Sequence, residues 1–279
     1  MPETAFINGR FLPLAEASVS IEDRGFQFGD GVYEVIRTYG GRPFKLDAHI
    51  GRLNRSAEAI ALSQPYSLEQ WREYITEGLR LAAFPESKIY VQITRGVAPR
   101  DHAYTPDLQP TIIMTVRELR PLGAGVHASG VDTMTVEDVR WGRCDIKSIN
   151  LLANVLARQQ AKEAGVFEAI LVRNGEVTEG SVSNVFLVEN RTLITAPEGP
   201  RILSGVTREL VVELARGEGF EVQERCPSRS QLYAASEVFL TGTTVEVLPV
   251  VRIDGRAIGA AEPGPVTRSL SKRFQEHTG

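Results

Sequence analysis

The sequence predicts an α+β protein of two domains, and three observations support that prediction. Segments in which apolar and polar residues alternate, as they do in strands, recur along the whole chain. Segments with apolar residues at helical spacing lie between them. A stretch rich in proline and glycine at 117–125 is the best candidate for a linker, which places the predicted domains at 1–119 and 120–279. With 279 residues, the chain is long enough to form a core in each domain.

The first domain is predicted to open with a hairpin. Apolar residues flank Asn8-Gly9, a pair suited to a type I′ turn. Ser67 and Gln70 form a capping box, which predicts that a helix begins there and runs to about Ala83. The other predicted elements are a strand after the glycine turn at 29–31, an amphipathic helix over 47–62, and strands over 88–96 and 110–116.

A lysine at a predicted junction between a strand and a helix is a candidate nucleophile. An extended segment leads to Lys147, and the residues around it are of helix-capping types. Because these are Asp145, Ser148 and Asn150, the helix should begin near 148–150. A lysine held there partly desolvated has a lowered pKa and can act as a nucleophile, including a Schiff-base lysine. In isolation, the pattern also fits an ordinary solvated surface lysine.

Turn residues and a proline define much of the chain beyond the lysine. Asn174-Gly175 and Asp254-Gly255 each predict a hairpin turn, and Pro265 marks the start of a terminal helix. The other predicted elements are strands within 166–188, at 193–195 and at 238–240, and a helix that comes after the loop at 202–208 and ends at Gly217.

The composition excludes several classes of function. A formal net charge of −4 gives no electrostatic basis for binding nucleic acid or an anionic membrane, and the longest apolar runs are shorter than a membrane span. The four histidines are scattered, without an H-E-x-x-H motif, so no metal site is expected. Cys144 and Cys226 make no disulfide framework, and the segment 1–6 lacks the features of a signal peptide. Both observations indicate a reducing, cytoplasmic compartment.

Three segments form a recognisable set. They are E-D-R-G-F-Q-F-G-D-G-V-Y-E at 22–34, D-I-K-S-I-N at 145–150 and T-E-G-S-V-S-N-V-F at 178–186. Together they resemble the fold-type IV pyridoxal-phosphate enzymes, and most closely the D-amino-acid aminotransferases, nearly from end to end. The resemblance implies a two-domain fold with pyridoxal 5′-phosphate between the domains. It places a substrate-trap loop in the N-terminal α/β domain (1–119) and the lysine and phosphate-binding loops in the C-terminal domain (120–279).

The resemblance also assigns residues to the cofactor. Lys147 would hold it covalently, and Glu179 would contact its pyridine nitrogen, where a carboxylate keeps the nitrogen protonated and the ring an electron sink. Arg52, in the segment H-x-x-R-L, would bind the phosphate, because a planar guanidinium can give an anion two parallel hydrogen bonds. The helix N-terminus at Val206 would offer backbone N–H groups to the same anion. The full set is Arg52, Lys147, Glu179, Leu203, Val206, Thr207 and Thr243.

The loop P-R-D-H at 99–102 resembles the carboxylate trap of the D-amino-acid aminotransferases. The resemblance implies that Arg100, His102 and Tyr33 bind the α-carboxylate of the substrate. A trap on one side of the cofactor fixes which face of the α-carbon loses its proton, and so selects D over L amino acids. In the family this loop reaches the active site of the partner subunit, so a homodimer is implied.

The implied reaction is a ping-pong transamination of a D-amino acid such as D-alanine with a 2-oxo acid such as 2-oxoglutarate. Lys147 would first anchor the cofactor and then, once the substrate amine displaces it, move the proton of the α-carbon. Two residues depart from the family's close pattern: Val182 replaces a serine near the lysine, and Gly242 stands where a serine near the phosphate can occur. Neither change removes a group that the chemistry requires.

Other functions stay open. Within the same fold they are a branched-chain L-amino-acid aminotransferase, an (R)-selective amine transaminase and aminodeoxychorismate lyase. The loop with Arg100 and His102 discriminates, because the first two families use other residues there and the lyase has no use for this trap. An alternative of a different class is a non-catalytic protein that binds pyridoxal phosphate or a metabolite, which the presence of Lys147 and Glu179 disfavours. A serine hydrolase is disfavoured because no G-x-S-x-G elbow occurs.

Overall fold

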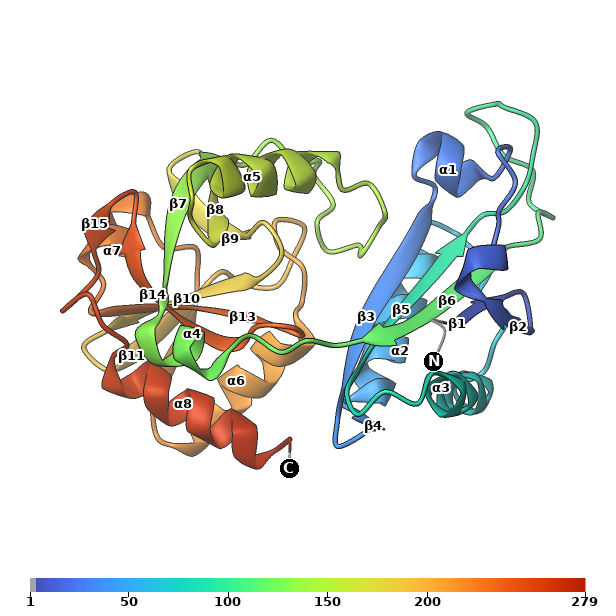
Figure 1. Cartoon of the computed structure of the whole chain (residues 1–279). Helices are drawn as coiled ribbons and strands as arrows, with labels where there is room; N and C mark the ends of the chain where they lie inside the picture. Colours follow the sequence, from blue (N-terminus) through green and yellow to red (C-terminus); the bar gives the residue numbers. More distant parts are fainter. Residues whose placement is uncertain (1–3, 279) are drawn as a thin grey trace. The chain divides into compact units, whose positions relative to one another are not determined.

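The computed structural model describes residues 4–278, so that residue 279 and residues 1–3, part of the N-terminal segment considered above, lie outside the description. The chain divides into two compact units, which Figure 1 shows in sequence colours. Unit 1 comprises Met1–Arg120 and Ile146–Asn150, and unit 2 comprises Pro121–Asp145 and Leu151–Gly279. The short segment that carries Lys147 therefore belongs to unit 1, although it lies well beyond the linker in the sequence.

Unit 1 is built on a six-stranded antiparallel sheet in the order β2-β1-β6-β5-β3-β4. Asn8 and Gly9, which join the first two strands, both have positive φ, so the predicted type I′ turn is confirmed. The strands are β1 (Thr4–Ile7), β2 (Arg10–Pro13), β3 (Gly31–Tyr39), β4 (Arg42–Pro43), β5 (Ser87–Thr94) and β6 (Thr111–Glu118).

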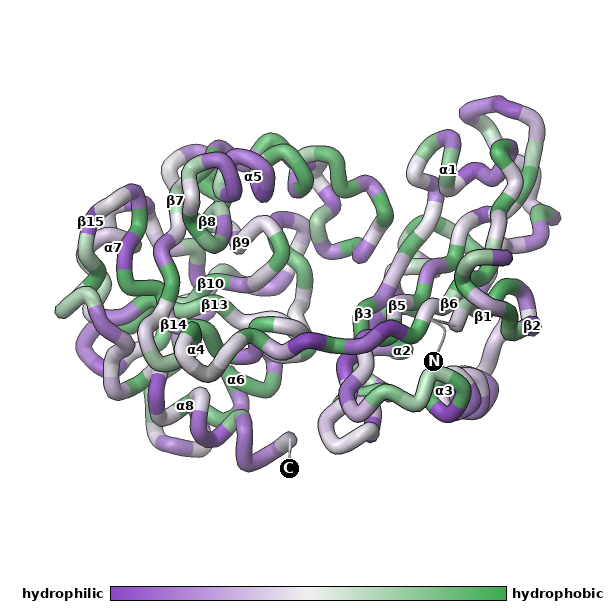
Figure 2. The backbone as a smooth tube through the Cα atoms, in the orientation of Figure 1, coloured by the Kyte–Doolittle hydropathy of each residue, from purple (hydrophilic) through white to green (hydrophobic). Residues whose placement is uncertain are grey.

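Two long helices cover this sheet, α2 against β3 and α3 against β1 and β6. The capping box predicted at Ser67 and Gln70 is present at the start of α3. Trp71 and Ile75 of α3 are fully buried in one cluster with Phe6 of β1. Figure 2 shows hydrophilic and hydrophobic residues alternating around the turns of α3, as expected for a helix with one buried face. The helical elements are η1 (Leu14–Glu16), α1 (Arg24–Phe28), α2 (Leu46–Ala59) and α3 (Leu68–Ala82).

Unit 2 is built on a nine-stranded mixed sheet. Its order is β12-β11-β10-β13-β14-β7-β8-β9, with β15 paired to β14. The pairs β11–β12, β14–β7 and β7–β8 are parallel, and the others are antiparallel. The strands are β7 (Val131–Glu137), β8 (Glu168–Arg173), β9 (Glu176–Gly180), β10 (Asn184–Glu189), β11 (Thr192–Thr195), β12 (Glu221–Glu224), β13 (Glu237–Gly242), β14 (Glu246–Ile253) and β15 (Arg256–Ala257).

Helices pack on this second sheet and complete its core. The rings of Phe186 in β10 and Phe239 in β13 are stacked 4.9 Å apart and fully buried. Helix α6 contacts β13, α8 contacts β13 and β14, and α5 contacts β7 and β8. The helices are α4 (Ala124–Ser129), α5 (Leu152–Glu163), α6 (Val206–Gly217), α7 (Arg229–Ala234) and α8 (Pro265–Glu276).

The predicted start of the helix after the lysine is wrong. Helix α5 begins at Leu152, two to four residues later, and no side chain caps it. The reason is that the predicted capping residues are used elsewhere in unit 1. Ser148 forms an isolated bridge with Val32, and the side chain of Asn150 lies against Gly29. The expected strand before the lysine is also wrong, because the chain from 138 to 147 is irregular.

The remaining predicted elements agree with the structure to within a few residues. The stretch between β6 and α4 is shorter than the predicted linker, because β6 continues to Glu118 and α4 begins at Ala124. None of the helices in the part of the chain described, 4–278, is both long and apolar enough to cross a membrane.

Candidate active site

Lys147 lies on a short segment that pairs with the beginning of strand β3. The backbone N–H of Tyr33 donates to the carbonyl of Lys147 (2.9 Å), and the N–H of Lys147 donates to the hydroxyl of Ser56 on α2 (3.1 Å). The Nζ atom of Lys147 lies 4.3 Å from the centre of the Tyr33 ring. Two residues predicted for the site, Lys147 and Tyr33, are therefore brought together within unit 1.

A glycine turn allows this pairing. The N–H of Ile149 donates to the carbonyl of Gly31 (3.1 Å). Gly29, which ends helix α1, has a φ of 68°, and a Cβ atom there would lie 2.3 Å from Oδ1 of Asn150. Both the left-handed backbone and the close approach of Asn150 require glycine at this position.

Arg52, predicted to bind phosphate, lies in a buried cluster of charges. Its Nε and Nη2 atoms donate to the two carboxylate oxygens of Glu34 at 2.6 and 2.9 Å, and Nδ1 of His49 lies 2.8 Å from the same carboxylate. Burial by itself would raise the pKa of Glu34, but the charges and hydrogen bonds of Arg52 and His49 outweigh it and lower that pKa to about 2. Burial lowers the pKa of His49. The cluster therefore holds Arg52 in one orientation.

Glu179, predicted to contact the pyridine nitrogen, is a buried residue of β9 in unit 2. Its Oε2 atom accepts hydrogen bonds from the N–H of Leu203 (3.0 Å) and from Nδ2 of Asn184 (3.0 Å). Its Oε1 atom accepts from Nη1 of Arg140. Burial raises the pKa of Glu179, while the adjacent Arg140 guanidinium acts in the opposite direction and favours the carboxylate.

Arg140 and Asp138 are residues of this site that the sequence prediction missed. Arg140 donates to Asp138 through Nε and Nη2, each at 2.9 Å, so it joins Asp138 to Glu179. Arg140 holds the pKa of Asp138 at about 2, although burial alone would raise it. The signal was present in the sequence, because Arg140 opens the same irregular stretch that leads to Lys147.

The predicted phosphate-binding residues lie on two loops that flank one segment of unit 2. Val206 and Thr207 begin helix α6, whose first N–H groups have no partner within the helix. A Cβ atom on Gly205, just before them, would lie 2.1 Å from Oδ1 of Asn184. A Cβ atom on Gly242, just before Thr243, would lie 3.9 Å from Cβ of Ser183. Both loops therefore border the segment Ser183-Asn184, next to the partners of Glu179.

A second buried carboxylate supports the turn that comes after Glu179. Oε1 of Glu168, on β8, accepts hydrogen bonds from the N–H of Val182 (2.8 Å) and the hydroxyl of Ser183 (2.9 Å). Its Oε2 atom is buried and has no hydrogen-bond partner among the residues that the structure describes. Burial raises the pKa of Glu168. The departure at Val182 leaves this turn intact, because the contact uses the backbone N–H.

Arg100 and His102 lie on an exposed loop of unit 1, residues 99–104, which we call the trap loop. Both side chains approach the ring of Phe28, at the end of α1. The guanidinium of Arg100 lies 4.6 Å from its centre, and the His102 ring lies 5.4 Å from it. The structure therefore groups Arg100 and His102 around Phe28.

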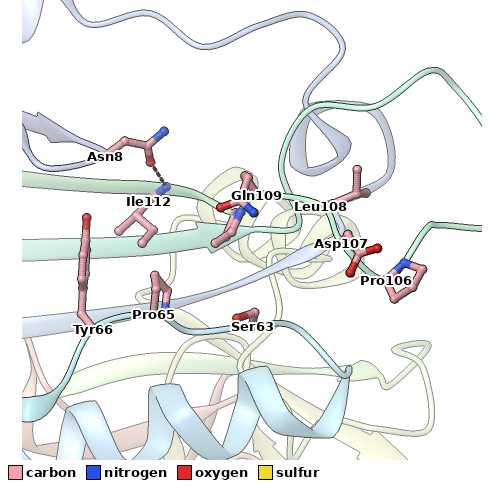
Figure 3. Close-up of a pocket in the computed structure, with 10 residues that line it drawn as sticks. Asn8, Ser63, Pro65, Tyr66, Pro106, Asp107, Leu108, Gln109 and Ile112 are labelled. Atoms are coloured by element: carbon pink, nitrogen blue, oxygen red, sulfur yellow. Dashed lines mark hydrogen bonds between the residues drawn. The ribbon is translucent and has the colours of Figure 1, made fainter.

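A pocket of about 490 Å³ lies elsewhere in unit 1, and none of the predicted site residues lines it. Figure 3 shows that its walls come from the segments 63–66 and 106–112 together with Asn8. Asn8 is engaged there, since its side-chain oxygen accepts from the N–H of Ile112 (2.7 Å). Asp107 is the one charged residue among the ten that line the pocket.

The sequence is similar to a family of known chemistry. Residues 31–253 match the family described as amino-transferase class IV. The D-alanine aminotransferase of Bacillus licheniformis is 43% identical over 268 residues, which cover 96% of this chain and 94% of that protein. The D-alanine aminotransferase of Staphylococcus haemolyticus is 42% identical over 274 residues, which cover 98% of this chain and 96% of that protein.

Solved structures give the same result for the fold. The branched-chain amino acid aminotransferase of Escherichia coli superposes with a TM-score of 0.92 at 28% identity, covering 99% of this chain and 94% of the other. The branched-chain enzyme from T.th., in a structure with pyridoxamine 5′-phosphate, gives a TM-score of 0.90 at 31% identity, with 99% and 94% covered.

The raised pKa of Glu168 predicts how stability depends on pH. The folded state holds the Glu168 proton more tightly than the unfolded chain does, so this contribution to stability is fully present below the usual glutamate pKa and is lost as pH rises through the folded-state value. Glu168→Gln keeps the shape but does not titrate. We expect the free energy of unfolding of the wild type to fall relative to Glu168→Gln between about pH 4 and about pH 8.

Urea denaturation at a series of pH values measures this difference. Glu213→Gln, at an exposed position of α6, is the matched control for the loss of one carboxylate. A gap between wild type and Glu168→Gln that stays constant with pH would contradict a proton held by Glu168.

Proposed function

This chain belongs to the class IV aminotransferases, which depend on pyridoxal 5′-phosphate, and we propose that it transfers the amino group of D-amino acids such as D-alanine to a 2-oxo acid such as 2-oxoglutarate. The family confirms the predicted fold-type IV architecture and the predicted aminotransferase activity. The observation that carries the choice of substrate is 40–43% identity to D-alanine aminotransferases over nearly the whole chain. The two half-reactions would follow one another in a ping-pong sequence.

The residues present fit the cofactor. Glu179 is a carboxylate that accepts from Arg140, Asn184 and Leu203, and an ionised carboxylate in this setting can accept a hydrogen bond from a protonated pyridine nitrogen. The N-terminus of α6 at Val206 offers free N–H groups and the positive end of a helix dipole to a phosphate. The bound cofactor would supply an electron sink for the charge that develops at the substrate's α-carbon.

We assign the remaining cofactor contacts on the resemblance. Arg52, held by Glu34, would present a fixed guanidinium to the phosphate, and Thr207 and Thr243 would add hydroxyl groups. The side chain of Leu203 would pack beside the ring that Glu179 contacts, since the two residues are already joined by a hydrogen bond.

Lys147 would perform two tasks through its Nζ atom. It would hold the cofactor covalently between turnovers, and it would then accept the proton that leaves the substrate's α-carbon. Its backbone is fixed on both sides by Tyr33 and Ser56, which limits the positions that the amine can reach. A fixed base is required because proton transfer needs hydrogen-bond distance to the reacting atom.

The substrate's α-carboxylate would be bound by Tyr33, Arg100 and His102. A guanidinium and an imidazole can both donate to a carboxylate, and a phenol adds a third donor. Holding the carboxylate on one side leaves one face of the α-carbon open to Lys147, which would give the preference for D-amino acids.

A branched-chain L-amino-acid aminotransferase is the second candidate. It is favoured by the fold, because branched-chain enzymes superpose with TM-scores of 0.92 and 0.90. Their identity is lower, at 28% and 31%. The trap loop with Arg100 and His102 favours the D-amino-acid enzyme.

We further propose a homodimer that works in the cytoplasm. Unit 1 exposes Ile21 and Phe26, and helix α5 of unit 2 exposes Leu152, Val155 and Leu156, each with more than half of its surface accessible. Clustered apolar residues of this kind are typical of protein–protein interfaces. The cytoplasmic assignment is supported by Cys144 and Cys226, which are both unpaired.

Replacing the lysine tests the assignment of the base. Lys147→Ala should remove the yellow absorbance of covalently held cofactor and lower kcat by roughly 10³-fold or more, because one group supplies both anchor and base. Lys162→Ala, at an exposed position of α5, is the control and should leave both unchanged. Full activity in Lys147→Ala would remove this residue from the reaction.

Replacing Arg100 tests the carboxylate trap. Arg100→Ala removes one charge-assisted contact worth roughly 1.5–3 kcal/mol, so kcat/KM for D-alanine should fall roughly 10- to 100-fold, mainly through KM. Arg80→Ala, whose side chain is 67% exposed on α3, is the matched control. An unchanged KM in Arg100→Ala would show that this residue does not contact the substrate.

Light scattering tests the assembly. The protein should scatter with twice the mass of the 30.7 kDa chain, and Leu152→Glu with Leu156→Glu should shift it towards the monomer by placing charges in the apolar patch of α5. Gln160→Glu, at another exposed position of the same helix, is the control for added charge. A fully active species of 30.7 kDa would contradict the dimer.

A further inference from the structure

A buried arginine binds the backbone of the trap loop. Arg24, in helix α1, is 3% exposed. Its Nη1 atom donates to the carbonyl of Asp101 (2.6 Å) and, at longer range, to that of Ala103 (3.5 Å), and its Nη2 atom donates to the carbonyl of His102 (3.1 Å). Within residues 4–278 these three carbonyls accept no other hydrogen bond. One side chain therefore holds the backbone next to Arg100 and at His102.

Asp30 fixes the orientation of Arg24. Its Oδ2 atom accepts from Nε of Arg24 (2.8 Å) and from Nε of Arg95 (2.9 Å). Arg95 in turn donates to the carbonyls of Ile60 (2.8 Å) and Ala61 (2.9 Å), where a positive charge is favourable because a helix ends there. Burial alone would raise the pKa of Asp30, but both arginines together lower it. The two guanidiniums are thus tied to one carboxylate and to the body of unit 1.

The far end of the trap loop is fixed by an aromatic contact. The ring of Tyr104 lies 3.7 Å from the guanidinium carbon of Arg95, a distance at which a cation attracts the face of a ring. The Arg100 and His102 side chains, by contrast, contact the ring of Phe28 and are otherwise exposed. The backbone of the loop is therefore anchored while its two functional side chains stay accessible.

We propose that Arg24 is a positioning residue for substrate selection: it fixes the backbone of the trap loop so that Arg100 and His102 meet the substrate's carboxylate without a further ordering cost. The inference rests on the proposed function, because it takes Arg100 and His102 as the carboxylate-binding groups. A mobile loop would have to be ordered on binding, and that cost would lower the affinity for every substrate that uses the trap.

A double-mutant cycle separates positioning from general support of the fold. Arg24→Ala should lower kcat/KM for D-alanine about tenfold, mainly through KM, while the yellow absorbance of the holoenzyme stays unchanged. In the background Arg100→Ala with His102→Ala, adding Arg24→Ala should change kcat/KM less than about twofold, because nothing is left to position. Arg80→Ala, exposed on α3, is the control in both backgrounds.

Arg24→Lys tests the geometry of the contact. A lysine keeps the charge but cannot span Asp30 and three carbonyls with a planar fork of donors. We therefore expect Arg24→Lys to retain the fold and the bound cofactor but to restore less than half of the loss in kcat/KM. Equal losses from Arg24→Ala in both backgrounds, or full activity in Arg24→Lys and Arg24→Ala alike, would overturn the proposal.

Limited trypsin digestion of the holoenzyme gives a readout that does not depend on turnover. Cleavage after Arg100 requires the loop to leave its anchored conformation, so the fragment that begins at Asp101 should form faster in Arg24→Ala and Arg24→Lys than in the wild type. An unchanged rate would overturn the proposal. A wild type that does not turn over D-alanine at all would instead overturn the proposed function, while the digestion would still report whether Arg24 holds the loop.

Discussion

The candidate active site depends on the pairing of five residues, Ile146–Asn150, with the beginning of β3. Two backbone hydrogen bonds, from Tyr33 to Lys147 and from Ile149 to Gly31, place the lysine on unit 1 although the chain has already entered unit 2. The pairing needs Gly29, whose left-handed backbone ends α1. Because α1 also carries the residues beneath the trap loop, the same short helix supports the lysine segment and the loop.

Buried charges give each part of the site its rigidity. Unit 1 contains the cluster of Glu34, His49 and Arg52, and unit 2 joins Glu179 to Asp138 through Arg140. Taking such groups out of water is costly unless each is paired and hydrogen-bonded, so they occupy one geometry and resist displacement. We therefore expect cofactor-facing groups to be held in place before the cofactor binds, which is how preorganised sites reduce the cost of binding.

Much of the fold could be predicted from the sequence, because hairpin turns, capping boxes and helical periodicity are local signals; Asn8-Gly9 and Ser67 are examples. The candidate site residues came from a family resemblance, and their roles stay predictions. The irregular segment before α5 could not be predicted, because its capping residues make contacts far away in the sequence, as Asn150 does with Gly29. The roles of Arg24 and Arg140 were missed for the same reason: a surface arginine and a buried one look alike until their partners are known.

The most direct test of the central claim is an absorbance titration of the purified holoenzyme with D-alanine and, in parallel, with L-leucine. A D-amino-acid aminotransferase should be yellow, and D-alanine alone should bleach it as the amino group passes to the cofactor. Bleaching by L-leucine alone would contradict the account and move the chain to the branched-chain enzymes. Protein that stays colourless and takes up no pyridoxal phosphate would contradict the assignment of the cofactor as well.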